Sequence, residues 1–187
     1  MKGRRRVNLT PYLSEQDLRR RLEVLAQELA RDYHGHELVI VGLLKGSFIF
    51  MADLVRLLSQ HDQHVVIDFM IVASYGSGTE SSGQVELVRD ITADIAGRPV
   101  LLVDDILDSG RTMTFAVAHL QGKHPESLRT CVFLDKPERR VVPFRADYTG
   151  FTVPDRFLVG YGLDYDSRYR ELPHLSIVSF EDGAAGG

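Results

Sequence analysis

The sequence predicts an α/β fold with a parallel, Rossmann-like sheet that is flanked by helices on both faces. Four short apolar runs, rich in leucine and β-branched residues, have the character of buried strands; they lie near residues 38–43, 65–72, 99–104 and 128–134. Segments with helical patterns intervene, so consecutive strands can be joined by crossovers and run parallel. The 187 residues fit one domain with a substantial core.

The first predicted helix begins at a capping box. Residues 1–13 are polar and interrupted by Pro11, and we expect them to form an arm with little structure of its own. Ser14 to Asp17 then has the pattern of a capping box. The leucines that follow at helical spacing are Leu18, Leu22, Leu25 and Leu29. We expect this helix to end near Gly35.

The apolar run at 38–43 leads into a candidate anion-binding loop. Lys45, Gly46 and Ser47 lie between this strand and a helix that begins near Phe48. A lysine in such a loop can hold a pyrophosphate as a point charge, and Gly46 lets main-chain amides approach the ligand closely. Taken alone, Lys45 is explained at least as well as an ordinary solvent-facing lysine.

A long β-hairpin is predicted at residues 65–90. The strand at 65–72 is followed by a segment, 73–84, that contains three glycines and five Ser or Thr residues. Residues 85–89 then have the alternation of a returning antiparallel strand. We expect a flexible tip that could close over a site, and the alternative is a disordered tip without a role.

The central stretch, residues 100–113, changes abruptly from an apolar strand to an acidic loop. Asp104 and Asp105 stand at the end of the strand, and a turn at 108–110 precedes a helix that begins near Thr112. The residues of this helix that we expect to face the sheet are Phe115, Ala118 and Leu120. Strand, acidic loop and helix N-terminus thus form one unit.

This unit has the parts of a sugar-phosphate site. Main-chain N–H groups around 109–112, the hydroxyls of Ser109 and Thr112, and the positive end of the helix can seat a phosphate. Asp104 and Asp105 would repel that phosphate, but they can accept hydrogen bonds from two ribose hydroxyls or hold a divalent metal ion. A sugar phosphate with a bound metal ion would match both the phosphate seat and the acid pair.

The last predicted strands bring further residues to the same edge of the sheet. Lys136 emerges at the end of the strand at 128–134, where open α/β sheets place ligands. Residues 157–161 have the character of a last short strand. The parts that we expect are a core at about 36–140, a small hood from about 1–35 and 141–182, and a disordered tail at 183–187, all in one domain.

Together these motifs resemble the phosphoribosyl pyrophosphate (PRPP) signature of type I phosphoribosyltransferases, and specifically their hypoxanthine-guanine branch. The likeness covers most of the chain. Its motifs are residues 100–113, Leu44-Lys45-Gly46-Ser47, Ser74-Tyr75-Gly76, Lys136, Val159-Gly160-Tyr161 and Leu163-Asp164-Tyr165. The competing interpretation is a structural acidic turn in another doubly wound protein, such as a phospho-acceptor receiver domain.

The resemblance implies a PRPP site that several loops build. Asp104 and Asp105 would grip the ribose hydroxyls and, directly or through water, Mg²⁺, with Asp164 as a second metal-side carboxylate. Asp108 is the candidate acid/base that exchanges a proton with the purine. The implied phosphate and pyrophosphate ligands are Asp104, Asp105, Ser109, Gly110, Arg111, Thr112, Lys45, Gly46 and Arg170. Asp104 stands where many relatives carry Glu, and Arg111 occupies a variable position.

The resemblance also implies a purine pocket and a lid. The implied purine-binding residues are Lys136, Phe157, Leu158 and Asp164, and the implied lid residues are Ser74 and Tyr75. Lys136 would donate to the 6-oxo group, Phe157 would stack on the ring, and main-chain groups near the other two would meet its edge. Without the resemblance, Phe157 would be a core residue, and Asp164 and Arg170 a solvated pair.

The predicted activity is purine salvage: transfer of 5-phosphoribosyl from PRPP to N9 of hypoxanthine and/or guanine, which yields IMP or GMP and pyrophosphate. One alternative is a non-catalytic PRPP-sensing regulator, but the roughly 36 residues before the first strand are too few for an added DNA-binding module. Another is transfer to xanthine or a different base. Lys136 with Phe157 favours a 6-oxopurine, and the preference among hypoxanthine, guanine and xanthine stays open.

Composition favours a cytoplasmic protein without nucleic-acid or membrane partners. The formal net charge of -4 argues against a general nucleic-acid surface, although Arg4 to Arg6 and Arg19 to Arg21 are basic runs. Cys131 is the single cysteine, so no internal disulfide can form, which favours a reducing compartment. The sequence has no signal-peptide pattern and no bilayer-spanning apolar run. The resemblance implies a homodimer or homotetramer.

Overall fold

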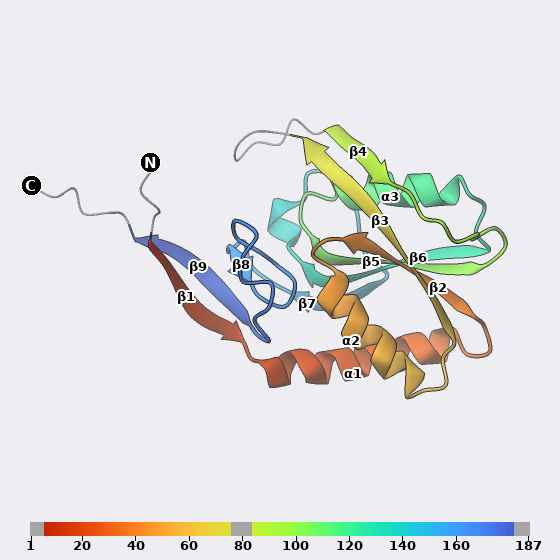
Figure 1. Ribbon diagram of the computed structural model, residues 1–187, viewed down its shortest axis with the longest axis horizontal. Helices are drawn as coiled ribbons and strands as arrows, with labels where there is room; N and C mark the ends of the chain where they lie inside the picture. The colour runs from red at the N-terminus through yellow and green to blue at the C-terminus, as the bar shows by residue number, and fades with distance from the viewer. Residues whose placement is uncertain (1–5, 76–83, 182–187) are drawn as a thin grey trace, which may run out of the picture.

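The computed structural model describes residues 6–75 and 84–181. It confirms the predicted α/β class, with helices on both faces of a central, mainly parallel sheet (Figure 1). Its elements in chain order are β1 (Arg6–Leu13), α1 (Glu15–Asp32), β2 (Leu38–Leu44), α2 (Phe48–Ser59), β3 (Val65–Tyr75), β4 (Gln84–Arg89), β5 (Pro99–Leu107), α3 (Arg111–Gln121), β6 (Ser127–Asp135), η1 (Pro137–Arg139), β7 (Tyr148–Thr152), β8 (Leu158–Val159) and β9 (Leu175–Glu181). No helix in these ranges is long and apolar enough to cross a membrane.

The central sheet has six strands in the order β4-β3-β2-β5-β6-β7. Neighbouring strands are parallel except β4, which returns antiparallel to β3 as the hairpin prediction required. The four predicted parallel strands are β2, β3, β5 and β6. β7 adds an edge strand that the sequence pattern did not reveal.

Strand β2 shows how the sheet is buried on both faces. Leu38 and Ile40 pack into the core that α1 and α2 cover, whereas Val39 and Val41 pack into the core that α3 covers. Because side chains alternate between the two faces of a strand, a continuous apolar run fills both cores. Figure 1 shows α1 and α2 on one side of the sheet and α3 on the other.

Helix α3 forms where it was predicted but turns a different face to the sheet. Its buried residues are Met113, Ala116 and Leu120. Phe115 is only half-buried and Ala118 is exposed, so the expectation for these two side chains was wrong. The buried positions are three and four residues apart and therefore lie on one face of the helix.

A second, three-stranded sheet joins the two ends of the chain in the order β1-β9-β8. The expectation of an arm without structure at residues 1–13 is wrong for residues 6–13, which pair antiparallel with β9. Pro11 lies in the outer strand beside a register shift, where its missing N–H is tolerated. Figure 1 shows β1 and β9 side by side and standing away from the central sheet.

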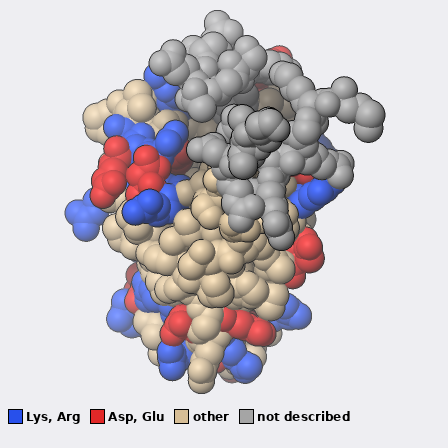
Figure 2. Space-filling view, turned by 90° about the vertical axis from the view of Figure 1, so that its left-hand side faces the viewer, with Lys and Arg blue, Asp and Glu red and all other residues tan. Residues whose placement is uncertain are grey.

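The surface at this end of the molecule carries both signs of charge. Figure 2 shows Lys and Arg side chains mixed with Asp and Glu at the margins of a largely uncharged middle. Opposite charges that lie close together cancel each other's field at longer range. On the part of this face that the structure describes, no broad field of one sign results.

Helix α1 begins at the predicted capping box. The Asp17 N–H donates to Ser14 Oγ at 3.2 Å, and the Ser14 N–H donates to the Asp17 carboxylate at 3.2 Å. The predicted leucine stripe is buried. Sequence and structure therefore agree on where this helix starts and which face it buries.

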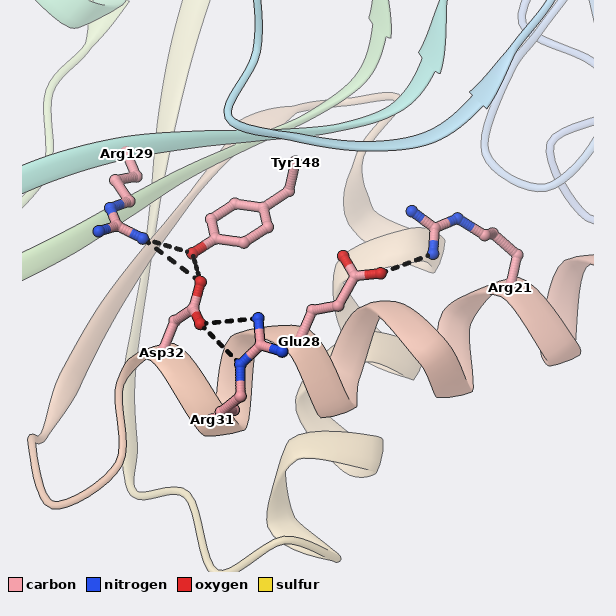
Figure 3. A network of polar contacts seen from close by, with 6 residues as sticks. All are labelled: Arg21, Glu28, Arg31, Asp32, Arg129 and Tyr148. Atoms are coloured by element: carbon pink, nitrogen blue, oxygen red, sulfur yellow. Dashed lines mark hydrogen bonds and ion pairs between the residues drawn. The ribbon is translucent and has the colours of Figure 1, made fainter.

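Polar contacts tie α1 to the edge strand β7. Arg21 donates to the main-chain oxygens of Thr149 and Gly150 at 2.6 and 2.8 Å. At the far end of the helix, the Tyr148 hydroxyl donates to Asp32 at 2.8 Å (Figure 3), and this hydrogen bond holds the pKa of the Asp32 carboxyl below its usual value. Arg21 thereby covers main-chain oxygens of a strand that has a neighbour on one side only.

Candidate functional site

A cavity of about 570 Å³ opens at the carboxyl ends of the central strands. The loops after β2 and β5 form much of its lining, and α3 starts beside it. Open parallel sheets bind ligands at this edge because the crossover loops and helix N-termini gather there. The predicted residues that line the cavity are Lys45, Gly46, Asp104, Asp105, Asp108, Ser109, Gly110, Arg111, Thr112, Asp164 and Arg170.

The loop before α3 offers a seat for an anion. Gly110 has a φ of +85° and stands directly before Arg111, the first residue of the helix. A β-carbon on Gly110 would lie 2.6 Å from the main-chain oxygen of Val142, so only glycine fits this close approach. The N–H groups of a first helical turn have no acceptor within the helix and are available to a ligand.

Two adjacent carboxylates lie near the end of β5. Asp104 is 7% exposed, and the Asp105 N–H donates to its Oδ1 at 2.9 Å. Burial raises the pKa of the Asp104 carboxyl well above its usual value, and the charge of Asp105 raises it further. Burial also raises the pKa of Asp105, while the charge of Arg170 opposes that change. The pair therefore favours a ligand that brings hydroxyl donors or positive charge.

The loop after β2 packs directly against this pair. A β-carbon on Gly46 would lie 1.6 Å from Oδ2 of Asp105, so the main chain of the loop touches the carboxylate. The peptide bond between Leu44 and Lys45 is cis. The loop that we predicted to hold pyrophosphate thus borders the predicted ribose-binding acids.

The segment between β8 and β9, which we predicted to be part of a hood, contributes Arg170 and Asp164 to the cavity. Their side chains form an ion pair with 2.6 Å between Nη2 and Oδ1. Arg170 also donates to the main-chain oxygen of Gly162 at 2.5 Å, and the Ser167 N–H donates to Asp164 at 2.8 Å. A β-carbon on Gly162 would lie 2.1 Å from the main-chain oxygen of Gly46, so the hood packs on the loop after β2.

Asp108 is held by two arginines that the sequence pattern did not single out. Arg139 Nε donates to Oδ1 of Asp108 at 2.8 Å, and Arg140 donates to its main-chain oxygen. Both arginines follow Lys136 closely at the end of β6. Their place just after the end of a parallel strand is the signal that could have found them.

Lys136 lies beside the cavity rather than in its lining. Its side chain is buried, and Nζ donates to the main-chain oxygen of Arg156 at 2.6 Å. Burial lowers the pKa of the Lys136 ammonium, because the charged form is poorly solvated there. The lysine is therefore oriented by the hood before any ligand is present.

The other predicted purine-binding side chains divide between surface and core. Phe157 is 47% exposed, so the interpretation of it as a core residue is wrong. Its ring meets Tyr165 edge-on with 5.7 Å between centroids, and Tyr165 in turn lies 5.2 Å from Phe180. Leu158 is buried in β8 and does not line the cavity. Of these two side chains, Phe157 is the exposed one.

The predicted lid motif lies where β3 ends. Ser74 and Tyr75 are its last residues and pair with β4, whereas residues 76–83 at the tip lie outside the described ranges. Val72 of β3 and Val85 of β4, near the strand ends that lead into the tip, line the cavity. The base of the predicted lid therefore borders the site.

A metal ion at this site would need ligands from substrate or water. Among the residues that the structure describes, no group of three or more His, Cys, Asp or Glu side chains could hold an ion. Mg²⁺ is usually bound through one or two carboxylates together with phosphate oxygens and water. The buried Asp104 and Asp105, whose environment disfavours their own negative charge, fit that pattern.

Known proteins are similar to this chain in both sequence and fold. The family model of the phosphoribosyl transferase domain matches residues 10–166. The hypoxanthine-guanine phosphoribosyltransferase of Aquifex aeolicus is 52% identical over 179 residues, which cover 95% of this chain and 99% of that protein. A structure of hypoxanthine phosphoribosyltransferase from Staphylococcus aureus has a TM-score of 0.85 at 42% identity and covers 91% of each chain. One from Trypanosoma cruzi also has a TM-score of 0.85, at 40% identity over 91% of each chain.

Proposed function

We propose, because the chain belongs to the phosphoribosyl transferase family, that it is a purine salvage enzyme. It transfers the 5-phosphoribosyl group of PRPP to N9 of a 6-oxopurine, hypoxanthine or guanine, and releases pyrophosphate. Relatives that are named hypoxanthine-guanine phosphoribosyltransferase confirm the predicted enzyme class. They do not favour a non-catalytic regulator.

One observation carries the proposal: a single cavity joins an anion seat, an acid pair and a loop with a cationic side chain. PRPP presents a terminal phosphate, two ribose hydroxyls and a pyrophosphate. Residues 109–112 suit the phosphate, Asp104 and Asp105 suit the hydroxyls, and Lys45 with Arg170 suits the pyrophosphate. Each part of the substrate thus has a chemically matched part of the lining.

The same residues can assist the chemical step. As the bond between the ribose and pyrophosphate breaks, the ribose gains oxocarbenium character. Carboxylates beside the ribose stabilise that positive charge, and Lys45 and Arg170 stabilise the negative charge on the leaving group. Fixed placement of both substrates contributes a further part of the rate.

Mg²⁺ is the divalent ion that we assign to this site. Asp104 and Asp105, and Asp164 as a second metal-side carboxylate, would contact it directly or through water together with oxygens of PRPP, since the three do not form one ligand group in the described residues. When bound, it would neutralise and orient the pyrophosphate. Burial of Asp104 and Asp105 supports the assignment, because a cation offsets the cost of two buried negative charges.

The base would lie between the core and the hood. Lys136 would donate to the 6-oxo group, Phe157 would stack on the ring, and main-chain groups near Leu158 and Asp164 would meet its edge. Asp108, beside the phosphate seat, would exchange a proton with the imidazole ring of the purine. The exposed face of Phe157 and the 2.6 Å bond that orients Lys136 support this arrangement.

Three further features complete the proposal. The hairpin that carries Ser74 and Tyr75 would close over the reacting centre and exclude water, which would otherwise hydrolyse PRPP.

The enzyme would act in the cytoplasm. The support is its single cysteine, Cys131, which is buried and free and therefore suits a reducing compartment. It would assemble as a homodimer or homotetramer.

Purified protein mixed with Mg²⁺, PRPP and one base at a time tests the proposal. Hypoxanthine or guanine should yield IMP or GMP together with an equal amount of pyrophosphate. PRPP binding without nucleotide formation would favour a PRPP-sensing regulator instead. Product formation with xanthine or a pyrimidine alone would change the assigned base.

A further inference from the structure

Arg139 links the two sides of the proposed purine site. Its Nε donates to Oδ1 of Asp108 at 2.8 Å, and its Nη1 lies 3.5 Å from a carboxylate oxygen of Asp155. Asp108 follows the central strand β5, whereas Asp155 stands two residues before Phe157 in the hood. One guanidinium group therefore joins the acid beside the phosphate seat to the loop that carries the aromatic ring.

This contact leaves Asp108 with one oxygen for a substrate. Oδ1 accepts the hydrogen bond from Arg139, and within the described residues no donor reaches Oδ2. Asp108 and Arg139 both line the cavity. A carboxylate that is fixed through one oxygen presents the other in a defined direction, as proton transfer to a bound base requires.

The main chain around Asp108 is held independently of the Arg139 side chain. Arg140 donates to the main-chain oxygen of Asp108. The N–H groups of Val141 and Val142 both donate to the main-chain oxygen of Ser109, at 3.0 and 2.9 Å. A change of the Arg139 side chain should therefore free the carboxylate of Asp108 without moving its loop.

The same turn also carries the proposed 6-oxo donor, Lys136. The Arg139 N–H donates to the main-chain oxygen of Lys136 at 3.1 Å, and the Lys136 N–H donates to that of Leu107 at 3.0 Å. Burial lowers the pKa of the Lys136 ammonium, the charge of Asp108 opposes that change, and the charge of Arg139 adds to it. The three side chains are thus close enough to act on one another.

We propose that Arg139 is a positioning residue for the phosphoribosyl transfer: it holds Oδ1 of Asp108 so that Oδ2 faces the imidazole ring of a purine bound by Lys136. The inference rests on the proposed function, because it concerns the same proton transfer. Arg139 acts through Asp108 and does not itself touch the reacting atoms. Its contribution to folding is small, since ion pairs that are nearly half exposed add little to stability.

A double-mutant cycle tests this inference with hypoxanthine as the base. Arg139→Gln should lower kcat about tenfold or more, while KM for PRPP changes less than about twofold. In an Asp108→Asn background, Arg139→Gln should cause little further loss, because the group through which it acts is already disabled. Arg139→Lys keeps the charge but not the planar guanidinium group, and it should recover part of kcat.

Arg145→Gln is the matched control, since Arg145 is exposed and lies outside the cavity lining, and it should keep the wild-type kcat. Equal losses from Arg139→Gln in the wild-type and Asp108→Asn backgrounds would overturn the inference, as would an unchanged kcat. If Arg139→Gln does not fold, Arg139→Lys takes its place in the same cycle. A wild-type protein that transfers to no 6-oxopurine would overturn the proposed function and this inference with it.

Discussion

Gly46, in the loop after β2, is in direct contact with Asp105, near the end of β5: a β-carbon on Gly46 would lie 1.6 Å from Oδ2 of Asp105. The strands β2 and β5 are neighbours in the sheet. Any side chain at position 46 must displace either the carboxylate or the main chain that carries Lys45. Both belong to the proposed PRPP site.

Gly46→Ala should therefore weaken PRPP binding. We expect the Kd for PRPP to rise at least about tenfold, because misplacement of a binding group by about 1 Å can cost even more. Titration calorimetry in the presence of Mg²⁺ measures this. Gly122→Ala is a suitable control, since a β-carbon there would have its nearest neighbour at 3.3 Å and lies at the far end of α3. An unchanged Kd in Gly46→Ala would contradict the contact.

Asp108→Asn should slow the transfer without loss of PRPP binding. Asparagine keeps the shape of the side chain but does not take up a proton, and general acid–base catalysis typically contributes about 10²–10⁴-fold. We expect kcat for hypoxanthine to fall by at least about 10²-fold while the Kd for PRPP stays within about twofold. Pre-steady-state turnover and PRPP titration separate the two effects. Full turnover in Asp108→Asn would remove Asp108 from the proton transfer.

The parallel core and its loops could be predicted because their signals are local. Each buried strand is a continuous apolar run, and the strand at 99–104 turns acidic where its carboxyl end reaches the cavity. Carboxyl ends of parallel strands meet at one edge, so residues from separate motifs could be expected together there. The cavity lining that joins Lys45 to Asp108 follows from this rule, whereas Arg170 was expected there only from the family resemblance.

The features that the sequence pattern did not predict depend on contacts between residues that are distant in the sequence. β1 is a strand because β9, from the other end of the chain, supplies its hydrogen bonds, and a polar segment with Pro11 gives no local sign of that. The buried face of α3 depends on how the helix rests on the sheet, and Ala118 was assigned to it wrongly. The role of Arg139 has no local sign in the sequence, because only the fold brings its partner Asp108 to it.

Asp104→Asn should stabilise the folded protein at neutral pH. Burial raises the pKa of Asp104 in the folded state above its ordinary value of 3.8, so its protonated form favours folding and that contribution is lost as pH rises through the raised pKa. At pH 7.5 asparagine removes the cost of a buried charge, and Tm should rise by about 2–4 °C for each kcal/mol gained. The gain should vanish near pH 4, where aspartate is protonated too.

Thermal melts at the two pH values measure this effect, and PRPP titration should show weakened binding in the same variant. Glu126→Gln, at an exposed position, is the matched control and should leave Tm unchanged at both pH values. A lower Tm for Asp104→Asn at pH 7.5 would mean that the acid pair stabilises the fold. That result would contradict the direction assigned to its pKa.

Lys136→Met should impair use of the base but not of PRPP. A hydrogen bond from a charged donor contributes about 1.5–3 kcal/mol, so kcat/KM for hypoxanthine should fall about 10–150-fold. The Kd for PRPP should change little, because Lys136 does not line the cavity. Lys123→Met is the control, because Lys123 lies just after the C-terminal end of α3 and outside the cavity lining. An equal loss with a base that lacks the 6-oxo group would argue against the assigned contact.

Arg21→Ala should destabilise the whole domain because it uncovers the edge strand β7. The side chain is about one quarter exposed and donates to the main-chain oxygens of Thr149 and Gly150 at 2.6 and 2.8 Å. Loss of two such bonds from a charged donor should lower the free energy of unfolding by about 1–3 kcal/mol. Arg19→Ala removes only an exposed pair with Glu23 and should cost less than about 1 kcal/mol. Urea denaturation measures both, and equal losses would show that the contact with β7 adds nothing beyond an ordinary surface pair.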